Sequence, residues 1–116
     1  MSEFNTTGET VEELSAGDSG SWLVTTAGSQ HIWDLDAWEY TRFPSEESKS
    51  GAMPFDGQPL KINRVQWLPK VGERPWVWFD DPEDPVFFEH FRLNSVVSSI
   101  ERLANDEPEE VGDETL

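Results

Sequence analysis

The densest group of chemically versatile side chains in this 116-residue chain is a run of carboxylates. Four acidic residues fall within five positions, namely Asp80, Asp81, Glu83 and Asp84. Carboxylate oxygens at this density could bind Ca²⁺ or Mg²⁺. An EF-hand loop, however, needs Gly at its sixth position and Glu at its twelfth, where this run has Pro85 and Phe91. We therefore expect an acidic turn between two strands and no cofactor, with a divalent-metal site as the alternative.

Nucleophilic and acid–base chemistry find little support in the positions of serine and histidine. Residues 17–20 read Gly-Asp-Ser-Gly, a string also found around the nucleophile of chymotrypsin-like proteases, which need a histidine base and an aspartate earlier in the chain. No histidine precedes this string. The two histidines, His31 and His90, could converge and form a metal or acid–base pair with Asp34 or Glu89. They show no His-x-His or His-Glu-x-x-His spacing, so we expect two isolated imidazoles and no enzymatic activity.

Aromatic side chains are abundant, with six Trp, seven Phe and one Tyr. Trp76 and Trp78 are two residues apart in a segment rich in β-formers, so they share one face of a strand. The rings could form a platform for a protein, a sugar or a stacked base, or they could fill the core of a small domain. We expect most of them in the core and one or two Trp exposed. Because Trp and Arg are enriched among interface anchors, the candidate partner-binding residues are Trp76, Trp78, Trp38 and Arg42.

Net charge limits the classes of partner. The chain has 24 Asp and Glu against 8 Lys and Arg, which gives a net charge of -16. A field of this sign opposes direct binding to nucleic acid or to an anionic membrane, and it favours docking onto a protein with a basic surface. It also permits an alternative in which carboxylates imitate phosphates and inhibit a DNA- or RNA-binding protein. The absence of cysteine excludes disulfides, thiolate metal sites and thiol chemistry.

The acidic residues are concentrated toward both ends of the chain. Residues 1–19 contain five acidic residues and no basic one, and residues 104–116 contain six and none. Both segments are poor in large apolar groups, so we expect disordered acidic tails on either side of a compact β domain at 20–103. The first twenty residues lack the features of a secretory signal, and no run is long and apolar enough to span a membrane. We expect a soluble cytoplasmic protein that could form a homodimer through an open edge strand.

Alternating and β-branched segments predict short strands with turn residues every ~8–12 positions. The expected strands are 22–26, 30–35, 38–43, 60–67, 76–79 and 86–93. Residues 95–103 fit a strand or a helix, and a last strand is preferred because it would close a barrel. The apolar face changes after Ile62, which predicts a bulge near Asn63 and Arg64. Residues 44–59 form a long loop whose apolar centre, 53–55, is expected to pack back onto the domain. The predicted fold is therefore all-β, a small barrel or sandwich of six to seven short antiparallel strands.

Short motifs along the strands resemble a set of small actinobacterial and actinophage proteins. The motifs are Thr-Thr-Ala-Gly at 25–28, Asp-Leu-Asp at 34–36, Thr-Arg-Phe-Pro at 41–44 and Val-Val-Ser-Ser-Ile-Glu-Arg-Leu at 96–103. The resemblance covers residues 22–44 and 94–103, about a third of the chain. It implies a complete all-β domain over roughly 20–103, and it implies no activity.

These features together predict a non-enzymatic small acidic β domain that acts by binding another macromolecule, with a protein as the expected partner. Two alternatives stay open. One is an acidic nucleic-acid mimic, and the other is a small divalent-metal-binding domain built on the acidic run at 80–84.

Overall fold

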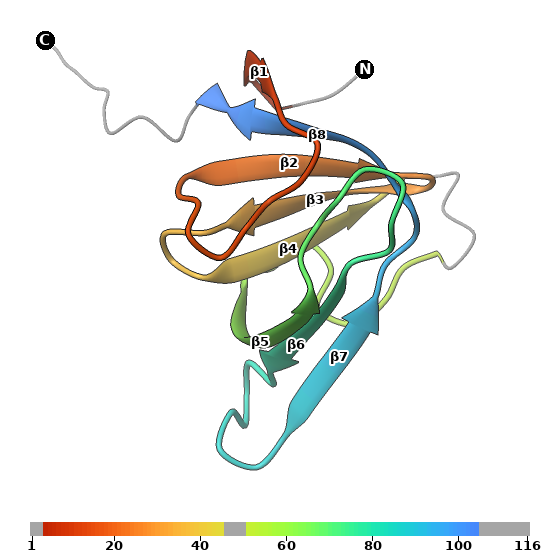
Figure 1. Cartoon of the computed structure of the whole chain (residues 1–116). Coiled ribbons are helices and arrows are strands. Elements are labelled where there is room, and N and C mark those ends of the chain that lie inside the picture. The colour runs from red at the N-terminus through yellow and green to blue at the C-terminus, as the bar shows by residue number, and fades with distance from the viewer. Residues whose placement is uncertain (1–3, 46–50, 105–116) are drawn as a thin grey trace, which may run out of the picture.

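The chain folds into one open β-sheet (Figure 1). The computed structural model describes residues 4–45 and 51–104. Across the sheet the strands run in the order β1-β8-β2-β3-β4-β5-β6-β7, and each strand is antiparallel to its neighbours. The strands are β1 Thr6–Thr10, β2 Ser21–Thr26, β3 Ser29–Asp34, β4 Glu39–Pro44, β5 Leu60–Trp67, β6 Trp76–Asp80, β7 Glu89–Leu93 and β8 Val97–Leu103. Within the described ranges, no helix has the length and apolarity to cross a membrane.

Strand β5 joins two parts of the sheet. It pairs with β4 only through Leu60 and Lys61, and the rest of the strand pairs with β6. Register shifts between Ile62 and Arg64 and again before Trp67 interrupt the β5–β6 ladder. Irregularities of this kind bend a strand and increase its twist. The bulge predicted near Asn63 and Arg64 is thus confirmed, and it lets the two parts of the sheet enclose one core.

Side-chain alternation explains which residues enter that core. In β6, Val77 and Phe79 are buried whereas the residues on either side of them are half-buried. In β3, Trp33 and His31 are buried and alternate with half-buried neighbours in the same way. This is the period of two expected for a strand with one face inward. The core cluster therefore draws on both parts of the sheet, and its largest members are Trp22, Trp33, Tyr40, Leu60, Ile62, Phe79 and Ile100.

The structure confirms the all-β antiparallel class and corrects its details. The prediction of a closed barrel is wrong, because β1 and β7 are separate ends of one open sheet. The count of six to seven strands is also wrong, since the described residues form eight and the sequence analysis missed β1. The ambiguous segment at 95–103 contains a strand, β8. Of the strand predicted at 86–93 only Glu89–Leu93 is extended, because the residues before it belong to the β6–β7 loop.

The prediction of a disordered N-terminal tail at 1–19 is wrong for the part that the structure describes. Thr6 lies opposite Leu103 in the β1–β8 pair. Leu14 is only 4% exposed, and its N–H donates to the Pro69 carbonyl at 2.9 Å. One well-placed leucine and backbone partners on neighbouring segments thus order a stretch that is poor in apolar residues. The tail predicted at 104–116 lies outside the described residues, apart from Ala104.

The loop before β5 packs onto the core, as predicted for its apolar centre. Phe55 contacts the ring of Phe79 with centroids 6.3 Å apart, and it belongs to the residues packed against the core cluster. Next to it, both carboxylate oxygens of Asp56 accept hydrogen bonds from Nη1 of Arg42, at 2.8 and 2.9 Å. Asp56 also accepts the backbone N–H of Met53 at 2.7 Å. These contacts fix the loop against β4 and β6.

Candidate partner-binding face

The outer side of β5, β6 and β7 carries a row of aromatic side chains. Val77 and Phe79 occupy the inner side of β6, so Trp76 and Trp78 must lie on its outer side. The pairing register places Trp67 of β5 opposite Trp76, and Phe91 of β7 opposite Trp78. We call these four residues, together with Leu93 opposite Trp76 on β7, the aromatic face: Trp67, Trp76, Trp78, Phe91 and Leu93.

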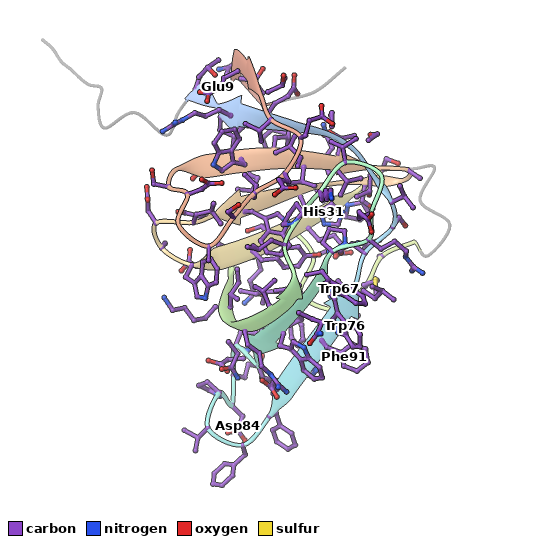
Figure 2. The ribbon with its side chains drawn as sticks, viewed as in Figure 1. Glu9, His31, Trp67, Trp76, Asp84 and Phe91 are labelled. Atoms are coloured by element: carbon purple, nitrogen blue, oxygen red, sulfur yellow. The ribbon has the colours of Figure 1, made fainter. Side chains whose placement is uncertain are left out.

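The rings of the aromatic face touch one another in sequence across the three strands. Trp67 and Trp76 meet edge to face with centroids 5.5 Å apart, and Trp76 stacks on Trp78 at 6.0 Å. Phe91 lies 5.1 Å from Trp78 and 6.0 Å from Trp76. Figure 2 shows Trp67, Trp76 and Phe91 following one another down this part of the sheet. The mutual contacts hold the rings in one arrangement before any partner arrives.

Much of this apolar surface is open to solvent. Trp67 is 53% exposed and Phe91 is 58% exposed, while Leu93 retains 39%. Isolated exposed apolar residues are ordinary on protein surfaces, but a contiguous set of large rings is not. In the β6–β7 loop, Val86 and Phe87 are also exposed, at 82% and 81%. This part of the molecule therefore leaves several large apolar side chains exposed to solvent.

Polar groups from β5 and β7 border the aromatic face. The guanidinium of Arg64 lies 4.2 Å from the Trp78 ring centroid, a cation–π contact. Arg64 also lies 3.6 Å from the Glu89 carboxylate, and Asn63 donates to the same carboxylate at 2.6 Å. These groups make a polar rim of the kind that surrounds the apolar centre of protein interfaces.

A pocket of about 500 Å³ opens beside Trp67. Its walls combine the turn after β5 with the segment after β1, and its charged members are Glu13, Lys70, Glu73 and Arg74. Three of these charges already have partners, since Lys70 lies 3.8 Å from Glu13 and Arg74 donates to the Asn94 carbonyl at 2.8 Å. The pocket thus adds a hollow with both apolar and charged walls beside the aromatic face, and it presents no set of convergent catalytic groups among the described residues.

The structure separates the four residues proposed from the sequence for partner binding. Trp76 and Trp78 lie on the aromatic face. Trp38 lies in the turn before β4, where it adopts a left-handed φ of 59° and packs against the core cluster. Arg42 is only 4% exposed and is bound to Asp56, so its assignment as a surface contact is wrong. An arginine in a sequence does not reveal whether a distant carboxylate will bury it.

The partner-binding residues proposed from the sequence did not include Trp67, Phe91 and Leu93. Phe91 and Leu93 alternate with His90 and Arg92, so their common side could have been read from the period of two. Trp67 had no such signal, because the register shift before it changes which side of β5 the residue occupies.

In the acidic run, both carboxylate oxygens of Asp81 already have hydrogen-bond partners. Oδ1 of Asp81 accepts the N–H groups of Glu83 and Asp84 at 2.8 and 3.0 Å, and its Oδ2 lies 2.8 Å from Nε2 of His90. The hydrogen bond from His90 and those from the backbone hold the pKa of Asp81 below its usual value. Asp80, Glu83 and Asp84 do not converge with it: within residues 4–45 and 51–104, no three His, Asp or Glu side chains gather closely enough to hold a metal ion.

The two histidines have separate environments. His31 is buried between Thr26 and Tyr40, whereas His90 is partly exposed on β7 and contacts Asp81 and Phe55. Neither Asp34 nor Glu89 bonds to an imidazole: Asp34 accepts the N–H groups of Asp36 and Ala37, and Glu89 binds Asn63 and Arg64. Within the described residues, the two histidines thus do not come together with Asp34 or Glu89 in one site.

No protein-family model, no curated protein and no solved structure matches this chain. The resemblance over residues 22–44 and 94–103 accordingly stays a prediction.

Proposed function

We propose that this protein is a non-catalytic binding domain and that its aromatic face docks onto another protein. The observation that carries the proposal is the exposure of Trp67 and Phe91, each more than half open, in direct contact with the stacked pair Trp76 and Trp78. Tryptophan is enriched among the few residues that dominate binding energy at protein interfaces. A face built this way loses little side-chain entropy when a partner covers it.

Net charge favours a partner with a basic surface. The chain carries -16 formal charges, whereas the aromatic face itself contributes a paired Arg64 and Glu89 at its rim. The apolar centre would therefore supply affinity, and the acidic field around it would accelerate encounter with a basic protein. This division predicts association rates that fall steeply with added salt and dissociation rates that change little.

The experiment compares capture by the full chain with capture by two single variants, Trp67→Ala and Phe91→Ala. Both side chains are exposed, so the fold should tolerate their loss. Thr7→Ala, on exposed β1 at the opposite end of the sheet, is the control. A specific partner from native lysate is a protein that the full chain and Thr7→Ala retain and that both aromatic variants lose.

The affinity for that isolated partner should then fall about 30-fold for at least one aromatic variant, as expected for loss of a central interface anchor worth about 2 kcal/mol. If every protein retained by the full chain is retained equally by Trp67→Ala and Phe91→Ala, the aromatic face is not the binding surface. Retention that disappears for all variants at moderate salt would indicate nonspecific charge attraction instead.

A further inference from the structure

The two edges of the sheet differ in character. Edge strand β1 reads Thr-Thr-Gly-Glu-Thr, is almost entirely exposed, and meets β8 with a shifted register. Short length, a charged side chain and irregular pairing are devices by which proteins protect an edge from further strands. Edge strand β7 reads Glu-His-Phe-Arg-Leu and pairs with β6 through five consecutive residues without a shift. Of the described strands, only β6 pairs with β7, so its other side presents a regular backbone edge.

We infer that the open edge of β7 is a strand-addition site, at which an extended segment of the partner protein becomes a ninth strand of the sheet. The inference rests on the proposed function and specifies how the partner binds. The incoming segment runs antiparallel to β7, as every neighbouring pair in this sheet does. Its main chain supplies hydrogen bonds to the β7 backbone, and its alternate side chains supply specificity.

Alternation in β7 determines which side chains the segment needs. Phe91 and Leu93 lie on the outer side of β7, and His90 and Arg92 lie on the inner side. Residues directly opposite each other in an antiparallel pair have Cβ atoms ~4.5–5.5 Å apart. Every second residue of the segment would therefore lie beside Phe91 or Leu93 and extend the aromatic face by one strand. Apolar side chains at those alternate positions fit the surface.

Charge predicts the order of apolar and basic residues along the segment. The acidic β6–β7 loop adjoins the first residue of β7, Glu89, whereas Leu93 ends the strand. Figure 2 shows Asp84 in this loop, beyond Phe91 and away from Trp67. No ion pair joins Asp80, Glu83 or Asp84 to a cation among the described residues. In antiparallel pairing the last residues of the incoming segment lie beside the start of β7. Lysine or arginine should therefore follow the apolar positions, not precede them.

Two synthetic peptides of identical composition test both parts of the inference. The forward peptide is Thr-Val-Thr-Val-Thr-Lys-Lys, and the reverse peptide is Lys-Lys-Thr-Val-Thr-Val-Thr, both with blocked ends. The full-length protein is titrated with each, and binding is followed by amide NMR shifts and by hydrogen exchange. We expect the forward peptide to bind at least about 5-fold more tightly than the reverse peptide at low salt. We also expect new exchange protection at alternate amides of β7 and none at β1.

Methylating peptide nitrogens separates strand addition from contact with the aromatic face. Methylation at the alternate positions whose N–H groups face β7 should weaken binding more than about 10-fold, because each methyl group removes a backbone hydrogen bond to β7. Methylation at the other positions should change it little. Phe91→Lys should abolish binding, since lysine on an edge strand opposes pairing and repels the basic segment. Thr7→Lys on β1 is the matched control and should bind normally.

Several results would overturn the inference. Absence of binding, or equal effects of the two methylation patterns, would exclude strand addition. If binding needs Trp67 and Phe91 but leaves the β7 amides unprotected, the partner docks on the aromatic face alone, and the proposed function stands without a ninth strand. If light scattering of the protein without peptide shows a dimer whose β7 amides are protected, the occupant of the edge is a second copy of this chain.

Discussion

Nδ1 of His31 lies 3.0 Å from the hydroxyl of Tyr40, and that hydroxyl donates its one proton to Oδ1 of Asn94 at 2.9 Å. Tyr40 can therefore only accept from the imidazole, which requires a proton on Nδ1. Nε2 of His31 is then an acceptor that lies 3.2 Å from the Thr26 hydroxyl; this hydroxyl also lies 3.2 Å from the Ser29 carbonyl oxygen, and its one proton serves one of the two acceptors at a time. A neutral imidazole satisfies this buried chain of hydrogen bonds, which makes His31 part of the folded core.

His31 should make the stability of the protein depend on pH below neutrality. Burial, followed by the nearby charges of Arg42 and Arg92, lowers the pKa of His31 from 6.5 to about 3. As pH falls, the unfolded chain therefore takes up this proton first. The stabilisation is complete above pH 6.5 and is lost progressively as the pH falls toward 3. At pH 5 the free energy of unfolding should be lower by about 2 kcal/mol on account of this group.

The measurement compares urea unfolding of the wild type with that of His31→Gln near pH 7.5 and near pH 5. The glutamine variant should be less stable near pH 7.5, because the hydrogen-bonded chain is disturbed. Its deficit should shrink by about 2 kcal/mol at the lower pH, since only the wild type loses the histidine contribution. The carboxylates titrate equally in both proteins, so they do not contribute to the difference. A deficit that stays constant between the two pH values would contradict a neutral buried His31.

Tyr40 is the only tyrosine of the chain, so its ionisation can be followed by absorbance without interference. Burial raises the pKa of Tyr40 to about 12, although Arg92 and Arg42 oppose the shift. The stabilisation is complete below pH 10, the ordinary value, and is lost as the pH rises through 12. The native protein should therefore show phenolate absorbance about two pH units later than the urea-unfolded chain. Tyr40→Phe is the control, and an unshifted midpoint in still-folded protein would contradict the burial.

Asp56 should matter far more to stability than the exposed ion pairs. Its carboxylate binds Arg42 through two hydrogen bonds and lies 3.9 Å from Nη1 of Arg92. Asp56→Ala would leave two buried guanidinium groups without this anion, and we expect unfolding free energy to fall by about 3–5 kcal/mol. Glu13→Gln breaks the exposed pair with Lys70 and should cost less than about 1 kcal/mol. Denaturant unfolding measures both, and similar losses would contradict this ranking.

Divalent cations should leave the thermal midpoint unchanged. Both oxygens of Asp81 already have partners in His90 and in the loop backbone, so a metal would have to displace them. A cation that binds only the folded state raises Tm with concentration. We expect no rise with Ca²⁺, Mg²⁺ or Mn²⁺ in the low millimolar range. A saturable rise that Asp81→Asn abolishes would establish a metal site in the acidic run.

The sequence was informative where local pattern and tertiary environment agree. The alternation in β6 predicts that Trp76 and Trp78 share a face, and the change of apolar face after Ile62 predicts the irregularity in β5. Neither pattern states which side of β6 faces the core. That choice depends on Phe79, which packs against Tyr40 and Phe55 from distant parts of the chain. The exposed side was therefore beyond local reasoning.

Arg42 and β1 show the second limit of the sequence. Arg42 lies two residues after Tyr40 in β4, so a common side for the two could be inferred. The burial of Arg42, however, depends on Asp56 in a loop 14 residues away. β1 has the composition of a solvated segment, and its order comes from the edge that β8 offers. In both cases a long-range partner outweighs local composition, and no local signal indicates that partner.

Leu14 provides the test of whether the N-terminal segment belongs to the folded unit. Its side chain is buried in the core cluster, and the adjoining backbone is tied to the turn after β5: the Val71 N–H donates to the Glu12 carbonyl at 2.8 Å. Leu14→Ala should lower the free energy of unfolding by about 2–5 kcal/mol. A chain shortened to residues 20–103 should lose at least as much, because it also loses β1 and these backbone hydrogen bonds.

Glu12→Ala, an exposed side chain next to the same backbone, should change stability by less than about 0.5 kcal/mol. Urea unfolding of the four proteins measures the differences. If the shortened chain unfolds at the same urea concentration as the full one, residues 6–14 lie on the domain without stabilising it.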